Sequence, residues 1–192
     1  MVDVMPNKPE SECNQPLRAK GRGPLRRFGK DRKGVLAIEF AFVIVPFLAL
    51  MAGIIEFGLS FLVNRTLDYA VAESTRLIKT GQAQKASFDK ARFKADVCAN
   101  MATFCDNARL EIDVRTFDNF ASIKNLPPMV GNDGNFAGGM SYTNSGGGQI
   151  VVARAVYTWP MFTALLGTDP GDAGTKRFLY STQVFRNEPF PW

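Results

Sequence analysis

A stretch of 29 residues, from Val35 to Val63, constrains the fold of this chain more than any other feature. Its only charged side chains are Glu39 and Glu56. About 20 apolar residues are enough for a helix to cross the hydrocarbon core of a bilayer. A buried core helix of a soluble protein is the alternative, but such helices rarely stay this apolar for so long. The sequence therefore predicts one membrane-spanning helix.

The charges on either side of this stretch predict its orientation. Residues 1–34 hold nine Lys or Arg side chains and four Asp or Glu side chains, a local net charge of +5. The net charge of the whole chain is also +5, so the basic excess lies entirely in this segment. Basic residues flanking a membrane helix mark its cytoplasmic side. A nucleic-acid-binding arm is the competing interpretation of such a run, but a membrane helix already requires an orienting cluster. We therefore expect a single-pass protein with a cytoplasmic N-terminus, an exported C-terminal part and no nucleic-acid partner.

Residues 1–34 read as a basic cytosolic leader. They contain Pro, Asn, Ser, Gly and charged residues without an apolar period, which is typical of a disordered segment. A cleavable secretory signal has an apolar region of about 7 to 15 residues followed by a small-residue cleavage site. Here the apolar run is too long and no such site follows it, so an ordinary signal peptide is excluded.

The helical pattern continues beyond the membrane span. After Leu59, apolar or small residues recur every three or four positions as far as Leu77, with charged residues between them. This spacing predicts an amphipathic helix that continues directly from the span, so that one helix covers residues 35–80. Gly81 is a stop signal. Pro46 should kink the helix, which membrane helices tolerate better than soluble ones do.

Residues 81–192 are expected to form a small exported domain of the α+β class. An antiparallel sheet of about three strands should follow a short helix, because alternating or apolar β-prone segments are separated by long connections. The expected elements are a helix at 87–100, strands at 108–117, 149–159 and 176–189, and a short helical stretch at 160–166. The glycine-rich segment 131–148 lacks a phosphate-binding motif and is interpreted as a flexible surface connection between two strands.

The composition disfavours an enzyme and a metal site. The chain has no histidine, which removes the commonest general base and the commonest metal ligand. The cysteines do not complete a zinc site. The acidic residues Glu111, Asp113 and Asp118 are assigned to the solvated side of a strand. We expect no catalytic residue, no metal and no cofactor.

Two of the three cysteines, Cys98 and Cys105, lie in the exported part, where disulfides form readily. On one uninterrupted helix, positions seven apart lie about 10 Å apart along the axis, which is too far for a disulfide. A disulfide between them therefore predicts a break in the helix near Ala102 and Thr103. Two unrelated buried thiols remain the alternative.

The segment around Glu39 resembles a known processing signal. A basic leader, Gly34, four apolar residues, Glu39 and a long apolar helix are similar to the substrates of prepilin peptidases in the type IV pilin superfamily. The further pattern of Glu39-Phe40, Pro46 and Glu56-Phe57-Gly58 resembles the TadE-like pseudopilin family of Tad (tight adherence) systems, which assemble Flp pili. The resemblance covers residues 33 to about 84.

The resemblance implies that the leader is cleaved between Gly34 and Val35. The new ammonium of Val35 would then lie one helical turn from Glu39, or near that residue of a neighbouring subunit, and would offset the cost of a carboxylate in lipid. Glu39 and Phe40 are the assembly residues that the resemblance implies. Phe40 replaces the tyrosine common in major Flp pilins, which favours a minor pilin.

The expected function is that of a minor pseudopilin supporting assembly of Tad/Flp-type pili from the bacterial inner membrane, with its C-terminal domain in the periplasm. The implied partners are a prepilin peptidase, other pilins or pseudopilins, and Tad assembly platform proteins. An unprocessed, signal-anchored periplasmic binding protein is the alternative. For Glu39 alone, a side chain that snorkels to the cytosolic interface is a further possibility.

Overall fold

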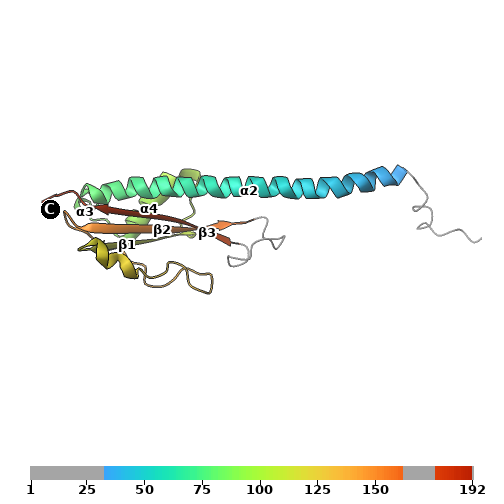
Figure 1. The fold of residues 1–192 in the computed structure, drawn as a ribbon. Helices are drawn as coiled ribbons and strands as arrows, with labels where there is room; N and C mark the ends of the chain where they lie inside the picture. Colours follow the sequence, from blue (N-terminus) through green and yellow to red (C-terminus); the bar gives the residue numbers. More distant parts are fainter. Residues whose placement is uncertain (1–32, 162–175, 192) are drawn as a thin grey trace, which may run out of the picture. The chain divides into compact units, whose positions relative to one another are not determined.

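The computed structural model describes residues 33–161 and 176–191. By its contacts the chain falls into two units, Met1–Phe47 and Leu48–Trp192, and each is described by itself. Eight elements follow one another along the chain (Figure 1). They are α2 (Lys33–Lys79), α3 (Gln82–Lys85), α4 (Lys90–Met101), the 3-10 turn η1 (Ala102–Phe104), β1 (Leu110–Phe117), the 3-10 turn η2 (Phe120–Asn125), β2 (Ile150–Pro160) and β3 (Lys176–Arg186).

The long helix α2 confirms the helix expected from the sequence. It has 47 residues and contains Pro46. The helix ends where Gly81 adopts a left-handed conformation with φ of 79°, which glycine reaches without strain. The carbonyl of Lys79 in the last turn accepts a hydrogen bond at 2.9 Å from the backbone N–H of Glu188. The C-terminal segment of the chain therefore satisfies one of the carbonyl groups that a helix end leaves free.

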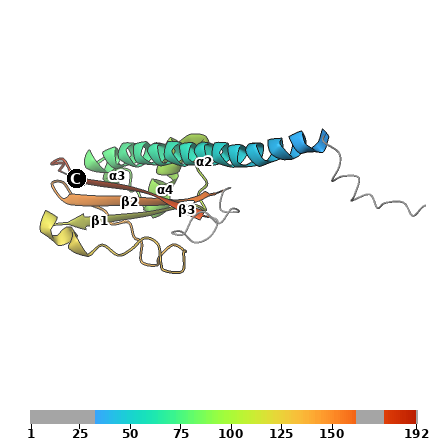
Figure 2. The ribbon, with the colours of Figure 1, turned by 45° about the vertical axis from the view of Figure 1, so that its right-hand side comes forward.

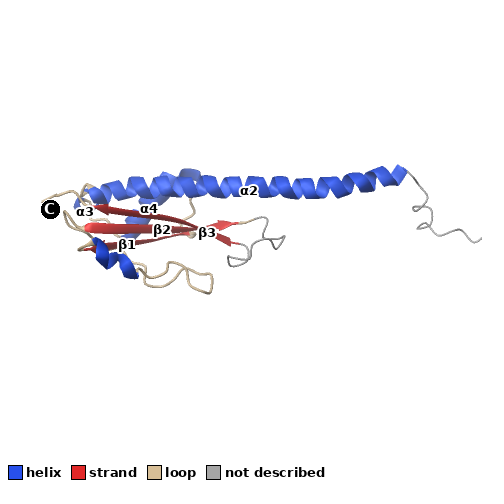
Figure 3. Cartoon of the chain, viewed as in Figure 1, coloured by secondary structure: helices blue, strands red, loops and turns tan. Residues whose placement is uncertain are grey.

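The three strands form one antiparallel sheet in the order β1-β2-β3, so β2 is central (Figure 3). Leu110 pairs with Tyr157 at one end of the β1–β2 ladder and Phe117 pairs with Ile150 at the other. In the β2–β3 ladder, Ile150 pairs with Arg186. The expectation of an α+β domain with a three-stranded antiparallel sheet is confirmed.

The core of the second unit lies between one face of this sheet and the helices α2 and α4, which lie on the same side of it (Figures 1 and 2). Successive residues of a strand point to opposite faces, so every second residue faces the helices. The buried residues of the core include Val63, Leu67, Val71 and Ile78 from α2, Phe93, Val97 and Met101 from α4, and Leu110, Ile112, Val114, Val151, Ala153, Ala155, Tyr157 and Leu179 from the sheet. The amphipathic half of α2 is thus an integral part of the C-terminal fold.

Some expected boundaries differ from those observed. The helix expected from residue 87 begins at Lys90, because the side chain of Asp89 caps it by accepting a hydrogen bond from the backbone N–H of Arg92 at 2.7 Å. Pro160 was expected to open a helix, but it is the last residue of β2. A proline is tolerated at the end of a strand. Most of that expected helical stretch lies outside the described residues.

Candidate functional site

The predicted processing and assembly residues lie in the first turns of α2. Gly34 and Val35 follow the first residue of the helix, Lys33. Val35 and Glu39 are four positions apart, so their side chains lie on the same face of the helix, one turn apart. No described side chain forms a hydrogen bond or ion pair with Glu39, and the side chain is exposed.

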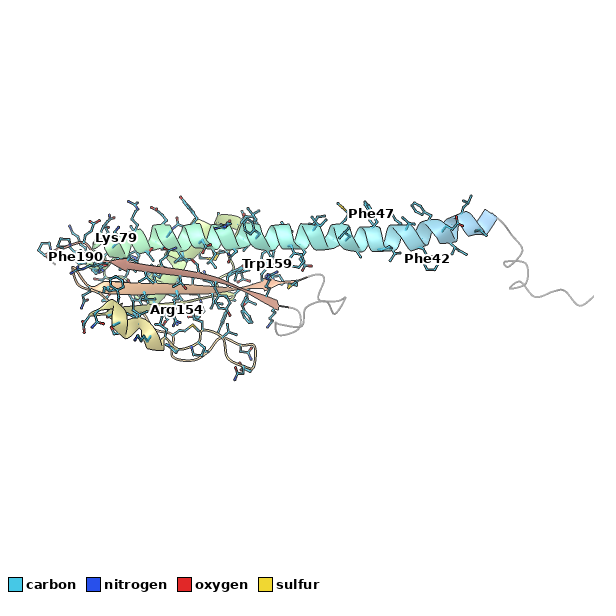
Figure 4. All side chains as sticks on the ribbon, viewed as in Figure 1. Phe42, Phe47, Lys79, Arg154, Trp159 and Phe190 are labelled. Carbon is cyan, nitrogen blue, oxygen red and sulfur yellow. A yellow bond between two sulfur atoms is a disulfide. The ribbon has the colours of Figure 1, made fainter. Side chains whose placement is uncertain are left out.

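The same helix presents an apolar surface. Residues 35–62 carry large hydrophobic side chains that are 37–77% exposed, among them Leu36, Phe40, Phe42 and Phe47 (Figure 4). Within the described residues, α2 is the one helix long and apolar enough to cross a membrane, judged by length and composition. Exposing so much apolar surface to water is unfavourable. Large exposed apolar patches therefore mark sites of contact with a membrane or another protein. We conclude that this helix anchors the chain as a single membrane pass.

The second carboxylate of the apolar stretch, Glu56, has a different environment from Glu39. The side chain of Glu56 is only 3% exposed, and it interacts within its own chain. Glu56 is therefore buried against the C-terminal domain, where a carboxylate requires polar partners, and it has at least one within the chain.

A cluster of buried charges on the other face of the sheet was not predicted. The side chain of Asp113 on β1 is fully buried and accepts hydrogen bonds from two guanidinium groups, those of Arg115 and Arg154. The Nε atom of Arg115 lies 3.0 Å from each carboxylate oxygen. Arg154 lies on the side of the sheet away from α2 (Figure 4). We call Asp113, Arg115 and Arg154 the charge cluster.

The charge cluster holds the long β1–β2 connection against the sheet. Arg115 donates to the carbonyl of Gly139 at 2.7 Å, and Arg154 donates to the carbonyl of Pro127 at 2.8 Å. The backbone N–H of Ser141 donates to Asp113 at 2.9 Å. The segment 131–148 is a surface connection between two strands, as expected, but charged hydrogen bonds at Gly139 and Ser141 hold its backbone against the sheet, which a flexible segment would not show.

The assignment of the strand's acidic residues to solvent was also wrong for two of the three. Burial alone would raise the pKa of Asp113, but the hydrogen bonds from Arg154, Ser141 and Arg115 outweigh it and hold that pKa below its ordinary value. Glu111 is half-buried and forms an ion pair with Lys90, whose Nζ lies 2.5 Å from the carboxylate. Burial opposes ionisation there as well, yet Lys90 and Lys94 of α4 lower the pKa of Glu111. Asp118 is exposed.

Cys98 and Cys105 form a disulfide, with Cα atoms 5.3 Å apart. Helix α4 ends at Met101, between the two cysteines, and the next residue, Ala102, has a φ of 52° that leaves the helical conformation. The expected break in the helix thus lies at Ala102. Beside it, the hydroxyl group of Tyr157 donates to the carbonyl of Phe104 at 2.8 Å, so the turn after α4 is attached to the central strand.

We predict that replacing both cysteines, Cys98→Ser with Cys105→Ser, lowers the free energy of unfolding by about 2 to 3 kcal/mol, because the disulfide restricts a short loop in the unfolded chain. Urea unfolding of the full chain in detergent, followed by circular dichroism, measures this difference. Cys13→Ser is the control and should leave the unfolding curve unchanged. Alkylation of both Cys98 and Cys105 in the untreated native protein would contradict the prediction.

No group of three or more Cys, Asp or Glu side chains in the described part of the chain is arranged to hold a metal ion. One groove among the described residues, of about 320 Å³, is lined by Arg109, Thr158, Lys176 and neighbouring residues. Arg109 is already paired with Asp106 at 3.2 Å. We take the first half of α2, which holds the predicted processing and assembly residues, as the candidate functional site.

Comparison with known proteins gives one match. The family of TadE-like proteins matches residues 34–76, about a fifth of the chain. No curated protein and no solved structure matches. The matched segment begins at Gly34, includes Glu39 and Phe40, and ends within the last turns of α2. Over this segment, the resemblance of the chain to the TadE-like family is confirmed.

Proposed function

We propose that the protein is a minor pseudopilin that supports assembly of Tad/Flp-type pili. The observation that carries the proposal is the TadE-like match over 34–76, which coincides with a helix whose large apolar side chains are exposed. A family match of this kind supports a role associated with the Tad pilus. In that role the helix first anchors the chain in the membrane and then packs against the helices of other pilins or pseudopilins.

Processing is the first step of the proposed function. A prepilin peptidase removes residues 1–34 on the cytoplasmic side, so that Val35 becomes the N-terminal residue of the mature chain. The new ammonium then lies beside Glu39, one helical turn away or on a neighbouring subunit, and the pair carries no net charge into the apolar contact. The exported domain, with residues 81–192, remains in the periplasm at the base or tip of the assembly.

The contacts within the second unit support this role. One face of α2 from Val63 onward, which includes Leu67 and Val71, is buried in the fold, whereas Phe57 and Phe61, toward the span, are about 60% exposed. A chain built in this way keeps its helix free for lateral contacts at one end and rigidly attached to a folded domain at the other. This is the arrangement that a subunit needs if helix packing is to position the domain.

Processing is tested by the substitution Gly34→Arg. We expect it to block removal of the leader, because a bulky cation does not fit a subsite that accepts a small residue. The measurement is the intact mass and N-terminal sequence of the protein recovered from membranes. Gly29→Arg, which adds the same charge five residues earlier, is the matched control and should be processed normally. If the wild-type protein retains residues 1–34, a signal-anchored binding protein is the better description.

A further inference from the structure

A groove lies between α2 and the edge strand β3, within the second unit. Its volume is about 570 Å³, and it is lined by Phe57, Ser60, Phe61 and Asn64 of α2 and by residues 177–180 of β3. We call it the β3 groove. The hydroxyl group of Ser60 lies in its wall, is buried, and has no hydrogen-bond partner. A buried polar atom without a hydrogen-bond partner is rare in proteins, and a bound polar group or water molecule is one explanation for it.

Two guanidinium groups cover aromatic rings along this groove. The Cζ atom of Arg65 lies 4.9 Å from the ring centre of Phe61, and the Cζ atom of Arg177 lies 5.5 Å from that of Phe57. Phe57, Phe61 and Arg65 are spaced four residues apart and therefore share one face of α2. No described carboxylate lies within ion-pair distance of either guanidinium. Asp68, three residues beyond Arg65, is half-buried and forms no ion pair with it, and Glu56, next to Phe57, is buried and already engaged.

The groove lies where the apolar surface of α2 gives way to polar residues. Ile54, Ile55, Leu59 and Leu62 are 37–58% exposed, and Asn64 and Arg65 follow directly. The stretch from Val35 to Phe57 has 23 residues, and about 20 apolar residues are enough to cross a hydrocarbon core. A helix that spans the bilayer from Val35 therefore brings the groove to the outer headgroup layer.

We propose that the β3 groove binds the headgroup of an anionic phospholipid in the outer leaflet. The guanidinium groups of Arg65 and Arg177 contact its phosphate, and the acyl chain lies along the exposed apolar face of α2. Guanidinium groups bind phosphate through paired hydrogen bonds, and aromatic side chains concentrate at membrane interfaces. The exposed ring of Tyr180, at the rim of the groove, lies at the same level. This inference rests on membrane anchoring and not on the pilus role.

Lipid fits the groove better than a protein strand does, although β3 is an edge strand. A strand added to β3 would extend the sheet, but it would place backbone groups against the exposed phenylalanine and leucine side chains of α2. Lipid meets both parts of the site, since the apolar wall continues the membrane-facing surface of the helix and the cations stand at its polar end. The bound lipid would hold the exported domain at a fixed height and tilt on the membrane.

The test compares two positions on β3. Tyr180 lines the groove whereas Val184 does not, and they are similarly exposed, at 52% and 48%. Each is replaced by Cys in the full chain carrying Cys13→Ser, after the disulfide has formed, and labelled with an environment-sensitive fluorophore. The chain is inserted into vesicles of phosphatidylglycerol and phosphatidylcholine whose acyl chains are brominated. We expect the label at 180 to be quenched and shifted to the blue, and the label at 184 to be unaffected.

Charge substitutions extend the test. The double substitution Arg65→Gln with Arg177→Gln should lower the ratio of quenched to unquenched label at 180 about 30-fold. Each basic residue near an anionic surface raises the affinity for that surface about fivefold, and two such residues are removed. Arg92→Gln is the matched control, since Arg92 covers the ring of Phe88 at 4.7 Å elsewhere on the domain. Circular dichroism and the intact disulfide verify that each variant is folded.

Three outcomes would overturn the proposal. Equal quenching at 180 and 184 would mean that no defined groove contacts lipid, and absence of quenching at both would mean that the domain stands off the membrane. The third outcome has two parts: the blue shift of the label at 180 disappears when the protein is diluted in excess lipid, and copies of the chain cross-link at position 180. This outcome would mean that the groove binds a second protein chain instead of lipid.

Discussion

Replacing Glu39 by alanine is expected to abolish piliation while leaving the protein inserted and largely cleaved. In the proposed assembly this carboxylate pairs with the ammonium of the processed Val35, in a contact from which water is excluded. Removing one partner of a buried ion pair typically costs about 3 to 5 kcal/mol, because the other charge is left uncompensated in a low dielectric. A loss of that size is enough to disrupt a lateral contact between helices. Glu39→Asp should restore part of the assembly, since its shorter side chain reaches less far.

The experiment counts surface pili in a strain in which each variant replaces the native protein, with protein levels matched by immunoblot. Glu73→Ala is the matched control, because it also removes a carboxylate from α2. Glu73 pairs only with the exposed Arg76 at 2.7 Å, and such a surface pair contributes a few tenths of a kcal/mol. If Glu39 merely snorkels to the interface, Glu39→Ala leaves piliation normal, and the assembly role then rests on the TadE-like resemblance alone.

The elements that could be predicted from the sequence are those fixed by strong local patterns. The long helix was predicted from a continuous apolar run and from Gly81, a residue that commonly follows a helix end. In the structure Lys79 is its last helical residue. The strands follow from alternation or β-branched runs, and all three were found within a few residues of their observed bounds. Even the break in the helix at Ala102 could be inferred, because a disulfide between positions seven apart requires one.

The charge cluster could not be predicted in the same way, because it joins residues distant in the chain. Asp113 alternates with Ile112 and Val114, so the local pattern of β1 places it on a solvated face. Its burial is due to the connection between β1 and β2, whose glycine-rich sequence gives no sign that it packs. One signal was present: Arg154 interrupts the apolar strand Ile150–Tyr157, and a charge in such a strand needs a partner on the neighbouring one. Arg154 and Asp113 are directly paired in the β1–β2 register.

The same limitation applies to the interplay between α2 and β3. From the sequence, Glu56 and Ser60 are polar interruptions of a membrane helix. In the structure both are buried, at 3% exposure each, on the side of α2 that faces its own domain. The sequence of this helix therefore looks almost uniformly apolar, but around residues 56–60 the helix has an exposed apolar face and a buried face. The polar residues Glu56 and Ser60 lie on the buried face, which packs against the C-terminal domain.

The largest expected effect on stability comes from Asp113→Ala. This substitution leaves the guanidinium groups of Arg115 and Arg154 without their shared carboxylate and removes the acceptor for the backbone N–H of Ser141. We expect the free energy of unfolding to fall by about 3 to 5 kcal/mol, the usual cost of breaking a buried charge pair. The connection at 131–148 should also become sensitive to proteases, since Gly139 and Ser141 lose their attachment to the sheet.

Urea unfolding of the full chain in detergent and limited proteolysis measure the two effects. Asp118→Ala is the control, because Asp118 is exposed at the end of the same strand region, and changes at such sites usually stay within about 0.5 kcal/mol. A protease-sensitive connection in an otherwise stable variant would show that the cluster orders this segment without supporting the sheet. Unchanged stability and unchanged proteolysis would show that the cluster does neither.

The pH dependence gives an independent check on Asp113. Its pKa is lower in the folded chain than the ordinary value of about 3.9. A group with a lowered folded-state pKa stabilises the fold fully above its unfolded pKa, and this stabilisation is lost as the pH falls through the folded-state pKa. The native protein should therefore lose stability progressively below about pH 4. Asp113→Asn removes this carboxylate, so its unfolding free energy should start lower near neutral pH and fall less steeply on acidification. Parallel pH profiles for the native protein and Asp113→Asn would mean that other carboxylates, such as Glu111 with its two lysine partners, dominate the acid sensitivity of the fold.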